Sequence, residues 1–429
     1  MKRLLIQTQL SNVVNGKFDL SCDSGWAMTI NRAREMLKLN PELHIDIMGP
    51  KSRQLIGQPK DLHPELFTSN RLRYVEHWVQ PNALVTRFDF DWPMVGEYLG
   101  LKKHVEDLSL RYDAVYINDP CHLKNFKALF HVIAGYQPKF YVHSHFVDLP
   151  SCPKFPLEAS LWYSQLEASV KADWNFWQCS SALREFELNA LQTLNSKIVD
   201  KILAKSTASD DGYSIEEITS PIVKENLRFT QEQWDEKTRG KVVLFFPNRI
   251  SPSSGDYTNG IKFFFELLPQ LHARFNKSEF VVMAGNPNLK FSNTELEDRC
   301  GKHGYVKLHD FTLNRDEYKF VASNSDIVIG LYDKDAYGGT SSRECIELGC
   351  LPLWLNCNEY SSIAQQARCD KYVLADFSDI IDVAEIMIND VSVSDPQIPA
   401  IVKRLQKVIR QKCSYEQTVP DMMSKMDLL

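Results

Sequence analysis

Short apolar runs alternate with segments of helical periodicity along most of this chain, and this alternation constrains the fold more than any other feature. A helix is expected at residues 24–39, just before Pro41. Alternating strands and helices form parallel, doubly wound sheets that bind ligands at the C-terminal ends of their strands. The first half therefore predicts an α/β domain. Its apolar runs predict buried strands at residues 3–8, 44–48, 113–118, 139–143 and 175–179, with further extended structure at 72–90.

The same pattern starts again after a polar, acidic stretch at residues 205–240. The runs KVVLFFP, EFVVMAGN, IVIGLY and LPLWLN predict the strands of a second sheet. A length of 429 residues suits two or three domains. We expect one domain at residues 1–238 and another at 239–400. Apolar residues at helical spacing then predict a C-terminal helix at 401–429 that crosses back to the first domain.

Composition narrows the class of protein. Hydrophobic residues make up 44% of the chain, enough for full cores, and the mean hydropathy is -0.30. No apolar run approaches the ~18 residues of a membrane span. The apolar run in the opening MKRLLIQTQLS is too short for a signal peptide. We therefore expect a soluble, cytoplasmic protein.

The ten cysteines and the net charge exclude further classes. No C-x-x-C pair and no His/Cys ligand spacing occur, so we expect reduced thiols and neither a zinc site nor a disulfide framework. The formal net charge of -6 argues against a protein that coats nucleic acid. A local basic face remains compatible with that total.

The stretch YGGTSSRECIELGCLPLW at residues 337–354 holds the richest candidate site. It predicts a Gly-Gly turn, a short helix and a buried strand. Ser341 and Glu344 fit a capping box, in which Glu344 only satisfies an amide at the helix start. Alternatively, the hydroxyls and amides hold an anion while Glu344 accepts hydrogen bonds from sugar hydroxyls. The candidate ligand-binding residues are Tyr337, Gly338, Gly339, Thr340, Ser341, Ser342 and Glu344.

Arg249 follows the first strand of the second domain and should point toward the same edge of the sheet. A guanidinium there matches a diphosphate through bidentate, charge-assisted hydrogen bonds. The alternative is an ordinary surface ion pair.

In the first domain, polar residues follow two predicted strands. Asn118 and Asp119 come after DAVYI, and His143, Ser144 and His145 end the run KFYV. Imidazoles at a strand end suit hydrogen bonding to a substrate and proton transfer, although a structural histidine is the alternative. A further acidic candidate in this group is Asp148. Gly25 opens a helix, where its amide either meets a ligand or simply starts the helix.

These features together resemble the two-domain GT-B nucleotide-sugar glycosyltransferases, in which the second domain holds the nucleotide diphosphate sugar. The resemblance implies two Rossmann-like domains facing a cleft, the first binding the acceptor. Arg249 and Glu344 match two of the family's donor-site positions. Two departures are Ala336, where an acidic residue is usual, and Asn259, near the usual second diphosphate ligand, with Lys262 three positions on.

Within that fold, the chain resembles in particular the bacteriophage DNA α-glucosyltransferases, which glucosylate 5-hydroxymethylcytosine. The resemblance rests on short segments in the same order. It implies a UDP-linked sugar as donor, 5-hydroxymethylcytosine in duplex DNA as acceptor, and retention at the anomeric carbon. The segments are those around Asn118, Tyr141 to His145, Glu167 to Asp173, Asn248-Arg249, and Glu344 to Trp354.

The same resemblance assigns roles. Arg249 and the Gly338–Ser342 amides stabilise the leaving diphosphate. Glu344 holds donor hydroxyls, while His143 and His145 orient or deprotonate the acceptor hydroxyl. The resemblance implies no requirement for a metal, and we expect a monomer or weak dimer. The alternatives are a cell-envelope saccharide as acceptor, and an inactive sugar-nucleotide-binding protein, the latter suggested by Ala336 and Asn259.

Overall fold

The computed structural model forms two compact units. It describes residues 2–8, 10, 13–77, 111–145, 147, 158–248, 260–275, 279–284, 305–306, 313–332 and 339–429. Residues Met1–Gly212 and Tyr415–Leu429 make the first unit, and Tyr213–Ser414 make the second. The boundaries expected at residues 238 and 400 differ from this division, because residues 213–238 and 401–414 pack in the core of the second unit.

The first unit is built on a parallel sheet. In the described residues its strand order is β10-β9-β8-β7-β1-β4-β6, and every pair is parallel. All five strands predicted for this half are confirmed. They are β1 (Lys2–Gln7), β4 (Leu43–Pro50), β7 (Ala114–Ile117), β8 (Lys139–Ser144) and β9 (Trp174–Trp177). The other described strands of the sheet are β6 (Leu72–His77) and β10 (Ser206–Ala208).

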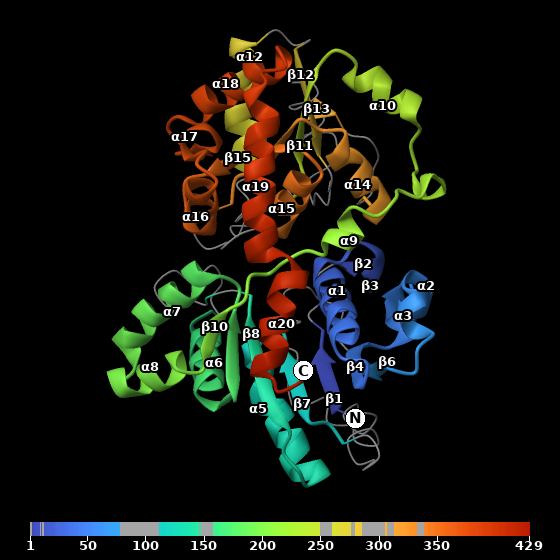
Figure 1. Cartoon of the computed structure of the whole chain (residues 1–429), viewed down its shortest axis with the longest axis vertical. Helices are drawn as coiled ribbons and strands as arrows, with labels where there is room; N and C mark the ends of the chain where they lie inside the picture. Colours follow the sequence, from blue (N-terminus) through green and yellow to red (C-terminus); the bar gives the residue numbers. More distant parts are fainter. Residues whose placement is uncertain are drawn as a thin grey trace. The chain divides into compact units, whose positions relative to one another are not determined.

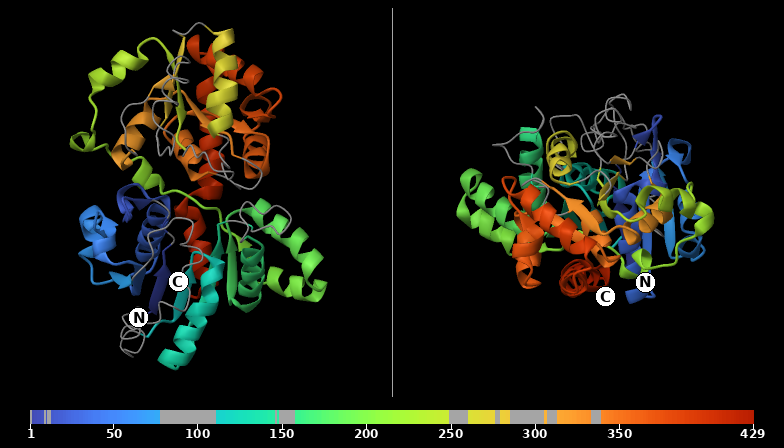
Figure 2. Two further views of the ribbon diagram at one scale, coloured as in Figure 1. Left: turned by 180° about the vertical axis from the view of Figure 1, so that it is seen from behind. Right: turned by 90° about the horizontal axis from the view of Figure 1, so that it is seen from above.

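Side chains alternate between the two faces of this sheet, as the period of a strand requires. Leu4 and Ile6 of β1 pack with helix α1 (Ser24–Leu39) and helix α20 (Tyr415–Lys425). Leu5 packs on the opposite face with α5 (Leu123–Ala128) and α6 (Glu158–Lys171). Figure 1 shows α1 and α20 in front of the sheet, and Figure 2 shows α5 from behind. Both faces are thus covered, as in doubly wound domains.

Smaller elements complete the first unit. A separate small sheet consists of β2 (Val13–Val14), β3 (Lys17–Asp19) and β5 (Leu55–Ile56). Strands β2 and β3 lie in the loop after β1, and β5 lies in the loop after β4. The remaining helices in the described residues are η1 (Leu20–Cys22), η2 (Ser52–Gln54), α2 (Pro59–Leu62), α3 (Pro64–Phe67), η5 (Pro120–His122), η6 (Leu129–Ala134), α7 (Ser180–Thr193) and α8 (Ser196–Leu203).

The second unit repeats the architecture around one core. Its described strands are ordered β13-β12-β11-β14-β15-β16, again with parallel pairs. The four strands predicted from the sequence are confirmed as β11 (Val242–Phe246), β12 (Phe280–Ala284), β14 (Ile327–Gly330) and β15 (Leu351–Leu355). The edges are β13 (Tyr305–Val306) and β16 (Leu374–Ala375). Its helices are α9 (Ile215–Ile218), η7 (Lys224–Asn226), α10 (Gln231–Thr238), α11 (Gly260–Lys262), η8 (Phe263–Leu267), α12 (Leu268–Arg274), α14 (Arg315–Ser323), α15 (Thr340–Glu347), α16 (Asn358–Gln366), α17 (Asp370–Val373), α18 (Ile380–Ser392) and α19 (Gln397–Cys413).

The C-terminal crossing consists of two helices. Helix α19 buries Ile401, Leu405 and Ile409 in the core of the second unit. The chain leaves that unit after Ser414, and α20 then packs against α1 in the first unit. None of the described helices is long and apolar enough to cross a membrane.

Candidate functional site

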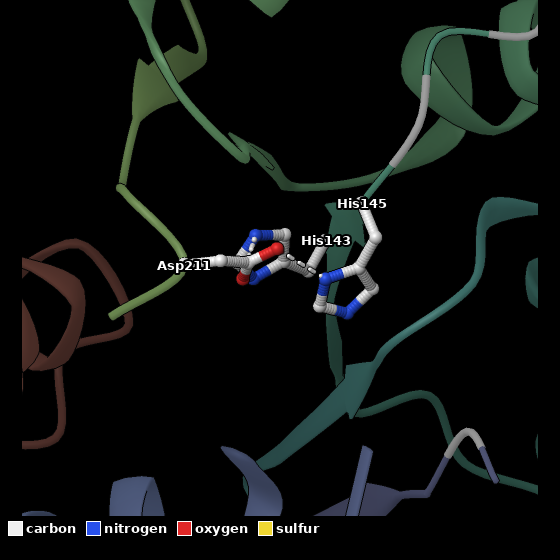
Figure 3. Close-up of side chains that lie close together, drawn as sticks. All are labelled: His143, His145 and Asp211. Carbon is white, nitrogen blue, oxygen red and sulfur yellow. Dashed lines mark hydrogen bonds and ion pairs between the residues drawn. The ribbon is translucent and has the colours of Figure 1, made fainter. Parts of the chain in front are cut away.

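A cluster of charged and polar side chains lies at the C-terminal edge of the first sheet. His143 belongs to the end of β8 and His145 follows it, while Asp211 lies three residues beyond β10. Because parallel strands end at the same edge, residues 66 positions apart meet here. His145 Nδ1 lies 2.7 Å from Asp211 Oδ2, and His143 Nε2 lies 3.2 Å from Oδ1. The two imidazole rings stack with centroids 4.4 Å apart (Figure 3).

Two further residues bind this cluster from neighbouring elements. Arg32 of α1 donates from Nη2 to Asp211 Oδ1 at 3.2 Å, and from Nη1 to the hydroxyl of Tyr116 in β7 at 2.8 Å. The Tyr116 hydroxyl also bonds to Nδ1 of His143. All these side chains are buried, and His143 is 0% exposed. The cluster is therefore a closed network around one carboxylate.

The charges of the network fix its ionisation. Burial of Asp211 favours its neutral form, but His145, His143 and Arg32 outweigh burial and lower the pKa of Asp211. Burial lowers the pKa of His143 well below its usual range, against the opposing charge of Asp211. Asp211 is thus a carboxylate and His143 a neutral imidazole at neutral pH.

Asn118 contacts the other ring nitrogen of His145. The Asn118 amide donates from Nδ2 to the backbone oxygen of Gln7 at 2.5 Å, and this bond sets the orientation of the amide. Asn118 Oδ1 therefore faces His145 Nε2, at 3.3 Å. Both nitrogens of His145 thus face oxygen acceptors.

The start of α15 forms the second group of residues, in the second unit. Ser341 donates from Oγ to Asn248 Oδ1 at 3.0 Å, and Tyr332 bonds to the same oxygen. Tyr360 accepts the amide of Gly339 at 2.7 Å. The side-chain Nδ2 of Asn248 is buried and has no hydrogen-bond partner in the described structure. Since the first amides of a helix lack partners within it, this helix start presents donors to a ligand.

Glu344 lies in the same helix but is not a cap. Arg315 of α14 binds its carboxylate through two hydrogen bonds, of 3.0 and 2.6 Å, and also binds Glu217 of α9. The capping box between Ser341 and Glu344 is not formed. Helix α15 begins at Thr340, so Ser341 lies inside its first turn, and the guanidinium offers Glu344 a stronger, charge-assisted partner.

The other predicted site residues have varied positions. The Lys262 ammonium lies 3.9 Å from the centre of the Phe377 ring, and Gly25 is buried in the first turn of α1. Asp119 accepts the amide of Cys121 as the cap of η5, and Ser144 is buried at the end of β8. Outside the described residues lie Arg249, Tyr337, Gly338, Asp148, Ala336 and Asn259.

Three charged residues of these groups were not among the residues predicted from the sequence. Asp211 follows β10, whose sequence Ser-Thr-Ala carries no apolar strand signal. Arg32 lies inside a helix where an arginine normally reaches solvent. Arg315 opens α14, which the sequence pattern did not identify as part of a site.

The chain is similar to known proteins in structure but not in sequence. No protein-family model matches the chain, and a sequence search of curated proteins finds no match. Solved structures match over its whole length. Anabaena HepE in complex with UDP and glucose has a TM-score of 0.64 at 12% identity, covering 100% of both chains.

Two further solved structures agree. A glycosyltransferase from Rickettsia africae gives a TM-score of 0.63 at 12% identity, covering 100% of this chain and 98% of its own. Sucrose-phosphate synthase from Thermosynechococcus elongatus gives 0.64 at 11% identity, with 99% and 98% covered. The chain has the GT-B fold. At such low identity the likeness defines the fold of this GT-B protein and not its substrates.

Proposed function

We propose that this chain is a glycosyltransferase that moves a sugar from a UDP-linked donor to a hydroxyl acceptor. The observation that carries the proposal is the GT-B fold, shared over the full length with HepE, which was solved with UDP and glucose. The two groups of polar residues lie one in each unit. The first lies at strand ends and the second at a helix start that follows a strand, and α/β sheets bind ligands at both kinds of place.

The donor diphosphate is assigned to the start of α15. A helix start attracts anions through its free amides and its dipole. The unpartnered Nδ2 of Asn248 and the hydroxyl of Ser341 add side-chain donors. The Arg249 guanidinium, proposed from the sequence, supplies positive charge to the leaving diphosphate. The remaining lone pairs of Glu344, which Arg315 holds in place, accept hydrogen bonds from sugar or ribose hydroxyls.

The acceptor hydroxyl is assigned to the first unit. His145 is the candidate group for orienting it, because it lies at the strand end and retains some exposure. Asp211 and Asn118 fix the ring of His145 from two sides. His143 is fully enclosed and therefore acts as a positioning residue for His145 and Asp211.

Two acceptors are proposed for separate reasons. The sequence resemblance proposes 5-hydroxymethylcytosine in duplex DNA, whose base must leave the helix at a cost of a few kcal/mol. The structural similarity to sucrose-phosphate synthase favours a saccharide hydroxyl as the second candidate.

The test measures release of UDP from a panel of UDP-sugars. Each donor is supplied with hydroxymethylated duplex DNA, with the same duplex unmodified, or with a panel of saccharides. Transfer only to the modified duplex supports the DNA acceptor, and transfer only to saccharides contradicts it. No UDP release with any acceptor, together with no UDP binding by calorimetry, would overturn the transferase proposal.

The variant Asn248→Ala tests the donor site. Loss of UDP binding is expected, because Nδ2 of this buried amide has no partner in the part of the chain that the structure describes. Asn226→Ala is the matched control, since Asn226 bonds to Asp316 and Asn314 away from the start of α15.

A further inference from the structure

We propose that His143, His145 and Asp211 form a binding site for one divalent transition-metal ion, such as Zn²⁺ or Co²⁺. One ligand atom from each residue lies within 4.8 Å of the other two, and all three side chains are buried. Figure 3 shows both rings directed at the carboxylate. The site does not depend on the proposed transferase activity and can be tested without any sugar nucleotide.

The spacing of the ligand atoms suits a metal centre. Zinc binds imidazole nitrogen and carboxylate oxygen at about 2.0–2.2 Å, which places neighbouring ligand atoms about 3.3 Å apart in a tetrahedron. His143 Nε2 and Asp211 Oδ1 are already 3.2 Å apart, and His145 Nδ1 and Oδ2 are 2.7 Å apart. Small outward movements of these side chains would admit an ion.

The buried Nε2 of His143 is a second, independent observation. His143 Nε2 is buried and makes no hydrogen bond in the described structure, although the Asp211 carboxylate is near it. His145 Nδ1 faces the same carboxylate, and its Nε2 faces Asn118 Oδ1. An ion in the centre would bind His143 Nε2, His145 Nδ1 and an oxygen of the Asp211 carboxylate.

The outer partners of both rings match those of metal-bound histidines. Such a histidine usually donates its other N–H to an oxygen, which fixes the ring. His143 Nδ1 bonds to the Tyr116 hydroxyl, and His145 Nε2 faces Asn118 Oδ1. Both outer contacts are therefore present in the folded chain before any ion binds.

Arg32 determines which ions can bind. Its guanidinium lies 3.2 Å from Asp211 Oδ1 and competes with a cation for the carboxylate. Binding must therefore draw on the two imidazoles. Imidazole suits Zn²⁺, Co²⁺ and Ni²⁺, whereas Mg²⁺ and Ca²⁺ require mainly oxygen ligands. We expect binding of the first group and none of Mg²⁺.

The experiment titrates the chelator-treated full chain with Co²⁺ and follows visible absorption. The expected result is a d–d band that saturates at one equivalent, disappears on addition of Zn²⁺ and is unaffected by Mg²⁺. His145→Gln and His143→Ala should abolish the band, and His131→Ala should retain it. His131 is the matched control because it is an exposed histidine of the same unit.

Three outcomes would overturn the proposal. The first is no stoichiometric Co²⁺ band in the unaltered chain, which needs no variant to interpret. The second is a band that persists in both histidine variants, with folding checked by circular dichroism. The third is a thiolate-to-cobalt charge-transfer band, which would assign the ion to the cysteines. A Zn²⁺-dependent rise in Tm that His145→Gln lacks would support the site independently, since ligands stabilise the state that binds them.

Discussion

Arg315 holds the carboxylate of Glu344 through two parallel hydrogen bonds, from Nη1 at 3.0 Å and from Nη2 at 2.6 Å. The same guanidinium binds Glu217 of α9. Glu344 is therefore an acceptor with a fixed orientation near the start of α15. That arrangement suits a group that receives hydrogen bonds from a ligand, because its rotamer is settled before the ligand arrives.

We expect Glu344→Gln to lower kcat/KM for the UDP-sugar roughly ten- to a hundredfold. A hydrogen bond to a charged acceptor contributes about 1.5–3 kcal/mol, and the amide of glutamine loses that charge. Steady-state kinetics over donor concentration provide the measurement. Glu217→Gln is the control, because it removes the other partner of Arg315 and leaves Glu344 in place. Equal losses in both variants would show that Glu344 acts only through the fold.

Gly339 offers a steric test of the donor site. A Cβ at this position would overlap the ring of Tyr332, whose hydroxyl bonds to Asn248 and Ser341. Gly339→Ala should therefore displace the ring and weaken UDP binding by about 1–3 kcal/mol, the cost of leaving buried polar groups unpaired. Calorimetry measures the affinity.

A double variant separates crowding from other effects at Gly339. In a Tyr332→Ala background the ring is gone, so adding Gly339→Ala should cost little further affinity. If the two losses simply add, the overlap with Tyr332 is not the cause.

The sequence predicted the strands better than it predicted the polar network. Runs such as KVVLFFP are buried on both faces of a parallel sheet, so their composition alone identifies them. Helix α1 ends at Leu39 as expected because Pro41 follows. The sequence did not predict β10, because its three residues are only half-buried and it is a strand through its pairing with β9.

The site residues also differ in whether the local sequence identifies them. His143 and His145 were identified because they directly follow an apolar run. Asp211 was not, because only the pairing of β10 with β9 brings it to the histidines. The capping box failed for a related reason. The motif depends only on neighbouring residues, but Arg315, whose side chain binds Glu344, lies 29 residues earlier in the chain.

Glu317 links stability to acidic pH. Burial of its carboxylate favours the neutral form, but Arg228 and the amides of Arg228 and Asn314 outweigh burial and lower the pKa of Glu317. In a window below about pH 4.5 the unfolded chain binds a proton at this residue and the folded chain does not, so stability falls as pH falls.

We therefore expect Glu317→Gln to reduce the free energy of unfolding at pH 7 by about 1.5–3 kcal/mol, the contribution of a hydrogen bond to a charged group. The difference between variant and unaltered chain should shrink as pH falls through that window. Urea unfolding at pH 7, 5 and 3.5 provides the measurement. A difference that stays constant with pH would contradict the linkage.

Arg32 and Asp211 provide the last test, of the buried network itself. Arg32→Met keeps most of the side-chain volume but leaves the Asp211 carboxylate buried without its guanidinium. Loss of one partner of a buried ion pair typically costs about 3–5 kcal/mol, and we expect a loss of that size in urea unfolding at pH 7.

Arg34→Met is the matched control for Arg32→Met, since Arg34 lies in the same helix and pairs with Glu65, whose side chain is 58% exposed. A pair with an exposed partner is worth about 0.2–1 kcal/mol. The double variant Arg32→Met/Asp211→Asn should be less destabilised than the sum of the two single variants, because the uncompensated charge is then removed. Equal costs for Arg32→Met and Arg34→Met would mean that the carboxylate draws its stabilisation from His145 and His143 alone.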